Sequence, residues 1–225
     1  MSLPRRPCGC APDARTRRVL RCLQLDVTPL RDDVGVSGEG DREVFHLRVE
    51  LAAGTSELMP LSELATSDPA AYEAAIAKYD DSTERQRLRE TTIPLLNRRW
   101  TEVVFLSPVH PHAIWQAWGE ITPKPLPPVE FWAISIDTLP TPIVVLDRKR
   151  SAVGDPIQAD EVSPLDTRHF QTLFETTQSN RAWLEMLTER GLKGGWFKGI
   201  PHVLTTGHVP ISSARTLSWD EHPMG

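Results

Sequence analysis

The sequence lacks an apolar run of about 18 residues, the length that a membrane-spanning helix needs, so we expect no membrane span. Cysteine is scarce, with 3 residues in a chain of 225, too few for a disulfide framework. The first 18 residues are basic but contain no apolar stretch, so we expect no secretory signal. Together these absences predict a cytoplasmic protein in a reducing compartment.

Familiar catalytic motifs are also missing. The chain contains no G-x-G-x-x-G, Walker A, G-x-S-x-G, H-E-x-x-H or C-x-x-C sequence, which argues against Rossmann dehydrogenases, P-loop enzymes and typical α/β-hydrolases. Cys8 and Cys10 could join Cys22 in a zinc site, but such sites generally use two cysteine pairs. We therefore predict free thiols and no metal site, and the sequence identifies no cofactor.

Charge is distributed unevenly along the chain. Residues 1–24 contain six arginines and one aspartate, a net charge of +5. Because the whole chain has a net charge of −5, the remaining residues carry −10. An acidic body makes poor contact with a phosphate backbone, so we do not expect specific nucleic-acid binding. We predict a flexible basic arm over residues 1–16, open to an acidic partner, and a single domain over residues 17–225.

Strand signals are clearest in residues 43–51, where apolar and polar side chains alternate. The apolar face of this segment, which we predict to be buried, consists of Phe45, Leu47, Val49 and Leu51. Further strands are predicted at 101–107, 130–137 and 141–147.

Helix signals lie between these strands. Asp68 before Pro69 is typical of a helix start, and Ser82 and Pro111 indicate two more. Two later helices are predicted at 167–175 and 179–190. The chain contains 20 prolines, and the Pro-rich segment 121–130 predicts an extended connection. The fold class predicted is α+β: one domain, a mixed β-sheet with helices mainly on one face, and Pro-rich connections.

Histidines in turns are the strongest candidates for catalysis, because imidazole titrates near neutral pH. Four of them lie beside proline or glycine: His110, His112, His202 and His208. Loops after neighbouring central strands meet at one edge of a sheet, so we predict that two of these turns share a pocket. If the turns do not converge, they are ordinary surface turns.

Candidate substrate-binding residues lie close to the same strand ends. Three consecutive cations, Arg148, Lys149 and Arg150, could hold a phosphate or a carboxylate. Ser107 and Trp132 complete the predicted substrate-binding set. The Gly-rich stretch 193–199 could offer backbone N–H groups to an anion, or could be a plain connection.

These residues predict an enzyme that carries out group transfer or hydrolysis on a phosphate-bearing small molecule or nucleotide. VVFLSP (103–108) and HVLTTGHVPI (202–211) resemble strands of ADP-ribosyltransferase-like folds, which implies ADP-ribosyl transfer. Where such enzymes often carry a catalytic glutamate, this chain has His202. The alternative is a non-catalytic binding protein that uses a Trp-rich surface and the basic arm.

Overall fold

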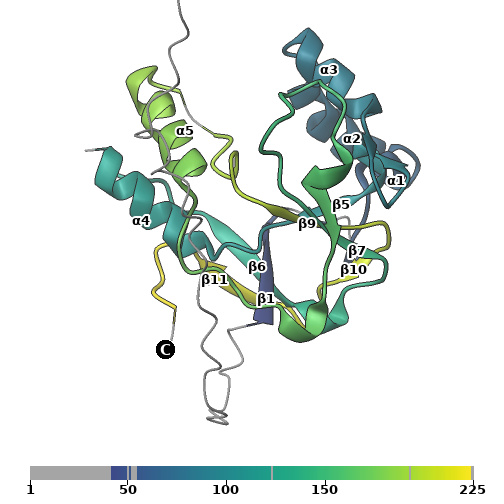
Figure 1. Cartoon of the computed structure of the whole chain (residues 1–225). Helices are drawn as coiled ribbons and strands as arrows, with labels where there is room; N and C mark the ends of the chain where they lie inside the picture. The colour runs from purple at the N-terminus through teal and green to yellow at the C-terminus, as the bar shows by residue number, and fades with distance from the viewer. Residues whose placement is uncertain (1–41, 50, 52–54, 123, 193, 224–225) are drawn as a thin grey trace, which may run out of the picture. The chain divides into compact units, whose positions relative to one another are not determined.

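The computed structural model describes residues 42–49, 51, 55–122, 124–192 and 194–223 (Figure 1). The predicted basic arm and all three cysteines lie outside the described residues. The described residues belong to one compact unit, Ser37–Gly225, and have the α+β fold that the sequence predicts. Within the described part of the chain, no helix is long and apolar enough to cross a bilayer.

Helices and short strands are interspersed along the chain. The helices are α1 (Leu61–Ser67), α2 (Pro69–Ile76), α3 (Thr83–Glu90), α4 (Pro111–Ile121) and α5 (Gln178–Glu189), and the 3-10 turns used below are η2 (Ala77–Tyr79), η3 (Trp100–Glu102) and η6 (Thr167–His169). The strands are β1 (Glu43–Leu47), β2 (Glu57–Leu58), β3 (Thr92–Ile93), β4 (Arg98–Arg99), β5 (Val104–Leu106), β6 (Glu130–Ser135), β7 (Ile143–Leu146), β8 (Val162–Pro164), β9 (His202–Thr205), β10 (Val209–Pro210) and β11 (Arg215–Ser218).

Two antiparallel sheets carry the core. One has the strand order β1-β6-β11 and the other β5-β9-β7-β8, while β10-β2 and β3-β4 form small pairs. Helices α4 and α5 lie side by side and cover one face of the first sheet, where Phe45, Phe131 and Leu184 share a buried cluster (Figure 1). The opposite face packs on the second sheet through a cluster that includes Val44 and Val203.

Strand β1 corrects one sequence-based prediction. Phe45 is buried as predicted, but the strand ends at Leu47, and Leu47 and Val49 are 40% and 43% exposed. Val44, on the face predicted to be polar, is fully buried. The prediction of a half-buried strand was wrong because the sheet is covered on both faces, by helices on one side and by the second sheet on the other.

Helix starts follow their capping residues. The Asp68 side chain accepts a hydrogen bond from the Ala71 N–H at 3.0 Å, and Ser82 caps α3 in the same way. The helix predicted at 167–175 is absent, and the segment contains only the single turn η6. Its backbone pairs instead with the segment after β5: the Leu173 N–H donates to the Pro108 carbonyl at 2.9 Å.

Candidate functional site

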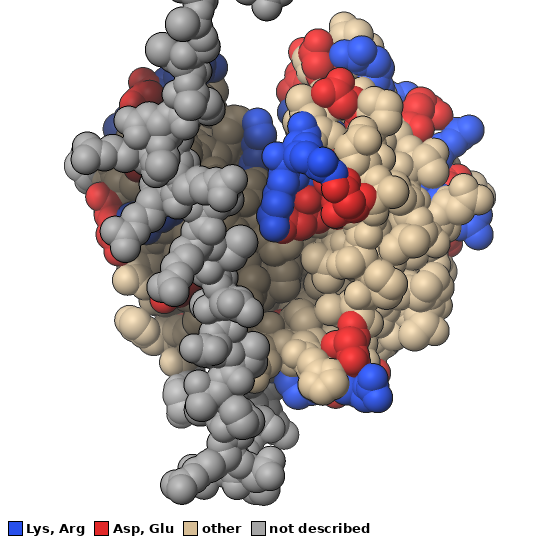
Figure 2. Space-filling view, in the orientation of Figure 1, with Lys and Arg blue, Asp and Glu red and all other residues tan. Residues whose placement is uncertain are grey.

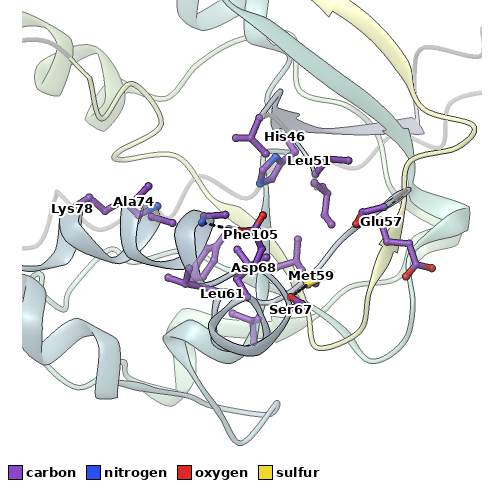
Figure 3. A pocket seen from close by; sticks show the side chains of 18 of the residues that line it. His46, Leu51, Glu57, Met59, Leu61, Ser67, Asp68, Ala74, Lys78 and Phe105 are labelled. Carbon is purple, nitrogen blue, oxygen red and sulfur yellow. Dashed lines mark hydrogen bonds between the residues drawn. The ribbon is translucent and has the colours of Figure 1, made fainter. Parts of the chain in front are cut away.

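A pocket of about 790 Å³ opens between the helices α1 and α2 and the strands β1, β2 and β5 (Figure 3). Most of its lining is apolar, and four small side chains of α2 form one wall: Ala70, Ala71, Ala74 and Ala75. Their spacing places them along one face of the helix, and their single methyl groups leave room there for a ligand. Such concave, mainly apolar sites with a few polar groups are typical of small-molecule binding.

His46 is the imidazole of this pocket. Its Nδ1 lies 2.7 Å from the carbonyl oxygen of Leu47, which can only accept, so Nδ1 carries the proton and Nε2 is free to accept one. The ring stacks on Trp132 with centroids 6.2 Å apart. The pKa of His46 is lowered to about 4, mainly by burial; the hydrogen bond to Leu47 opposes this shift, and the nearby Lys78 charge contributes to it. His46 is therefore a neutral proton acceptor at physiological pH.

Lys78 and Tyr79, from the turn η2, also line the pocket, and Lys78 lies at the other side of it from His46 (Figure 3). The Lys78 ammonium lies 5.1 Å from the centre of the Tyr79 ring. More than a third of Lys78 stays exposed, yet the atoms packed around it exclude enough water to lower its pKa, and Arg85 adds repulsion. The Tyr79 hydroxyl accepts a hydrogen bond from Trp100 Nε1 at 3.0 Å, which leaves its own proton available to donate.

An aromatic wall continues from this end of the pocket. Trp100 contacts Phe105 with ring centroids 4.3 Å apart, and Phe105 meets the His202 ring edge-on at 5.9 Å. Arg148 lies over Trp100 at 6.0 Å. Two residues singled out from the sequence, His202 and Arg148, therefore lie behind the pocket wall rather than in its lining.

His110 and His112 have mainly structural contacts at the start of α4. Nδ1 of His110 accepts the His112 backbone N–H at 3.1 Å and so caps the helix. Burial lowers the pKa of His110 to about 4. His112 is buried as well and donates from Nδ1 to the Trp219 carbonyl at 3.1 Å, and its ring contacts the His222 ring in a tilted arrangement with centroids 4.2 Å apart.

His202 begins β9, and His208 lies between β9 and β10. Strand β9 pairs with both β5 and β7, so the ends of β5 and β7 do meet beside His202, as the topological argument expects. His208, beyond the other end of β9, is exposed and paired with Glu57 and Glu63. None of the four turn histidines lines the 790 Å³ pocket, and their shared site stays a prediction.

The segment Arg148 to Arg150, predicted to bind an anion, is instead bound to groups of the chain itself. The Arg150 and Ser151 N–H groups donate to one oxygen of the Glu161 carboxylate at 2.8 Å, and the Gln158 N–H donates to the other at 2.9 Å. Lys149 pairs with Asp147 at 2.7 Å, and Arg150 pairs with Asp160. Figure 2 shows the same mixture on the visible face, where acidic and basic side chains lie next to one another in several places.

Ser107 and Trp132 complete the predicted set, and both are buried. The Ser107 hydroxyl accepts the Val109 N–H and donates to the Val109 carbonyl, which closes the turn after β5. Trp132 is 8% exposed and reaches the site only through His46. All seven tryptophans are buried or half-buried, so the described residues present no exposed Trp surface.

Sequence reasoning missed His46 and Lys78. It assigned His46 to the outward face of β1, together with Val44, although a valine on that face was a sign that it is covered. Lys78 looked like any charged residue at the end of a helix. In the part of the chain that the structure describes, no group of three or more His, Cys, Asp or Glu could hold a metal ion.

Comparisons with protein-family models, curated proteins and solved structures found no match to this chain.

Proposed function

We propose that the protein is an enzyme acting on a small molecule that has an apolar body and an acidic group, and that His46 is its proton-transfer group. The observation that carries the proposal is the placement of His46 and Lys78 in a mainly apolar pocket of about 790 Å³, whose lining also includes the carboxylates of Glu57 and Asp68. Titratable groups with displaced pKa values in a concave site are typical of catalytic centres. We place the site in this pocket, while a site shared by the turn histidines stays a separate prediction.

The chemistry follows from the protonation states. The free Nε2 of His46 can take a proton from a ligand O–H or N–H, and the positive charge of Lys78 stabilises the anion that remains. An acidic group bound beside these residues favours their charged forms and raises the pKa of His46 from about 4 toward the working pH. Binding of such a ligand is therefore coupled to proton uptake.

A phosphate-bearing or nucleotide substrate is the narrower version of this proposal. The two segments that resemble ADP-ribosyltransferase-like strands lie side by side, since Phe105 on β5 is opposite Leu204 on β9. This neighbourhood supports the narrower version, for which ADP-ribose is the direct probe by equilibrium dialysis. The non-catalytic alternative depends on an exposed Trp surface, for which the seven half-buried or buried tryptophans give no support.

The test uses 8-anilinonaphthalene-1-sulfonate, an aromatic anion whose fluorescence rises in apolar sites. We expect one molecule to bind per chain. Ala74→Phe fills the pocket and should weaken binding by roughly tenfold or more, whereas Ala77→Phe, an exposed position outside the lining, should not. Equal binding by both variants, with circular dichroism showing both folded, would contradict the proposal.

A second measurement isolates the role of His46. Calorimetric titration of the same probe near pH 5.5, in buffers of different ionisation enthalpy, counts the protons taken up on binding. The native protein should take up a substantial fraction of one proton, and His46→Gln should take up almost none. If the two proteins take up the same amount, another group exchanges the proton.

A further inference from the structure

The pocket has opposite charges at the two ends of one helical segment. Asp68 is the N-cap of α2, Lys78 belongs to the turn η2 that continues this helix, and both residues line the pocket (Figure 3). At a rise of about 1.5 Å per residue, their Cα atoms lie about 15 Å apart along the helix axis. A ligand that lies along this segment therefore passes from a carboxylate at one end to an ammonium at the other.

The wall between these two charges is an apolar helix face. Ala71, Ala74 and Ala75 line the pocket there, and together with Lys78 they follow the i, i+3, i+4, i+7 spacing of one side of a helix. None of these three alanines is buried, although their methyl groups are apolar. The apolar chain of a ligand laid along this face would cover them.

The Asp68 carboxylate has one oxygen that can bind a ligand. Its Oδ1 accepts the Ala71 N–H at 3.0 Å, whereas Oδ2 has no hydrogen-bond or ion-pair partner among the described residues. Within the same part of the chain, Lys78 forms no ion pair. The other carboxylate in the lining, that of Glu57, lies 3.1 Å from Nδ1 of His208 and is thus already paired. Asp68 and Lys78 are therefore the two lining residues whose charges can be neutralised by a ligand.

We propose that the pocket binds an elongated zwitterion, with an ammonium group beside Asp68, an apolar chain along the alanine face of α2 and an acidic group beside Lys78. The inference rests on the proposed function for the apolar body and the acidic group, and it adds a cationic group at the opposite end. A charge-assisted hydrogen bond at each end is roughly twice as strong as one between neutral groups. Asp68 then determines specificity, because a ligand with an apolar end leaves this carboxylate without a partner.

The test is calorimetric titration near pH 7.5 with three probes of the same chain length: 8-aminooctanoic acid, octanoic acid and octylamine. Asp68→Asn removes the charge and keeps the helix cap, because asparagine caps a helix as well as aspartate does. It should weaken binding of 8-aminooctanoic acid and octylamine roughly fivefold or more, and change that of octanoic acid by less than about twofold. Lys78→Met should weaken binding of the two carboxylic acids roughly fivefold and leave octylamine within about twofold.

Glu73→Gln is the matched control for Asp68→Asn. It removes the same charge from an exposed position of α2 outside the pocket lining. We expect it to change the affinity for each probe by less than about twofold, because a solvent-exposed charge is screened by salt. Circular dichroism should show all three variants folded.

The zwitterion site would be overturned if Asp68→Asn weakened octanoic acid as much as 8-aminooctanoic acid, if it weakened neither, or if Glu73→Gln had the same effect. These results would leave the pocket proposal standing. No detectable binding of 8-aminooctanoic acid to the native protein would also overturn the zwitterion site. In the reverse case, His46→Gln leaves proton uptake unchanged while Asp68→Asn and Lys78→Met keep their selective effects. The zwitterion site then stands and the proposed proton transfer does not.

Discussion

Nε2 of His208 lies 2.6 Å from Oε2 of Glu63, a residue 145 positions earlier in the chain. On the other side of the ring, Nδ1 lies 3.1 Å from the Glu57 carboxylate. A neutral imidazole has one N–H and can donate to only one of these groups, whereas an imidazolium donates to both. The hydrogen bond to Glu63, followed by that to Glu57, raises the pKa of His208. The protonated ring connects the turn after β9 to α1 and β2, two walls of the pocket.

The hydrogen bonds from His208 to Glu63 and Glu57 predict a pH dependence of the free energy of unfolding. Because the folded pKa of His208 is raised, its stabilisation is fully present below the unfolded value of about 6.5 and is lost as the pH rises through the folded pKa. The size should be below about 1 kcal/mol, since the side chain is 41% exposed. Urea unfolding between about pH 6 and pH 8 should show this loss in the native protein and not in His208→Gln. Glu63→Gln should flatten the same pH window, and adding it to His208→Gln should change nothing more.

Glu161 gives the opposite pH dependence. Burial raises the pKa of its carboxyl, but hydrogen bonds from Ser151, Gln158 and Arg150 outweigh this and hold the pKa at about 2. A depressed pKa contributes stability that is present above the unfolded value of about 4.5 and is lost as the pH falls toward 2.

We expect Glu161→Gln to cost about 1–2 kcal/mol at neutral pH, because the loop covers the carboxylate but lies at the molecular surface. Chemical denaturation at about pH 7 and pH 3 checks this, and the difference between the two proteins should shrink in acid. A constant difference would mean that the charge of Glu161 contributes nothing.

Local signals predicted the local structure well. Asp68 and Ser82 begin helices where expected, because a capping side chain needs only the next turn of its own helix. Gly191 ends α5 with a φ of +64°, the left-handed conformation that glycine adopts readily. The candidate site could not be predicted in this way, because it is formed by contacts between residues far apart in the sequence. His46 and Lys78 line one pocket only because β1 and the turn η2 border the same space, and a single strand pattern holds no information on that packing.

For a similar reason, the sequence did not predict that Glu161 would bind the segment Arg148 to Arg150. Arg148 to Arg150 follow a strand end, where an external anion could bind, and the sequence does not show that Glu161 folds back onto the same backbone. Such pairing is decided by the path of the loop between them.

Phe45 and Leu47 provide a matched pair for the corrected strand. Phe45 is 1% exposed and contacts the His110 ring at 4.9 Å, so Phe45→Ala should cost about 3–5 kcal/mol. Leu47 is 40% exposed, and Leu47→Ala should cost less than about 1 kcal/mol. Urea midpoints for both variants check the assignment. Similar losses would show that Leu47 is buried, as the alternation alone predicts.

Two glycines should respond to the same substitution with opposite sign. Gly154, in the loop before β8, has a φ of +85°, and a Cβ there would lie 2.6 Å from the carbonyl oxygen of Glu84 on α3. Gly154→Ala combines backbone strain with a clash against a helix and should destabilise the protein by about 1–3 kcal/mol. Gly119 lies inside α4, where a Cβ would meet nothing within 4 Å. Gly119→Ala should stabilise the protein by about 0.5–1 kcal/mol, because alanine loses less backbone entropy in a helix. Thermal unfolding of both variants tests whether the loop that carries Glu161 rests on α3: an unchanged melting temperature for Gly154→Ala would mean that it does not, whatever the result at Gly119.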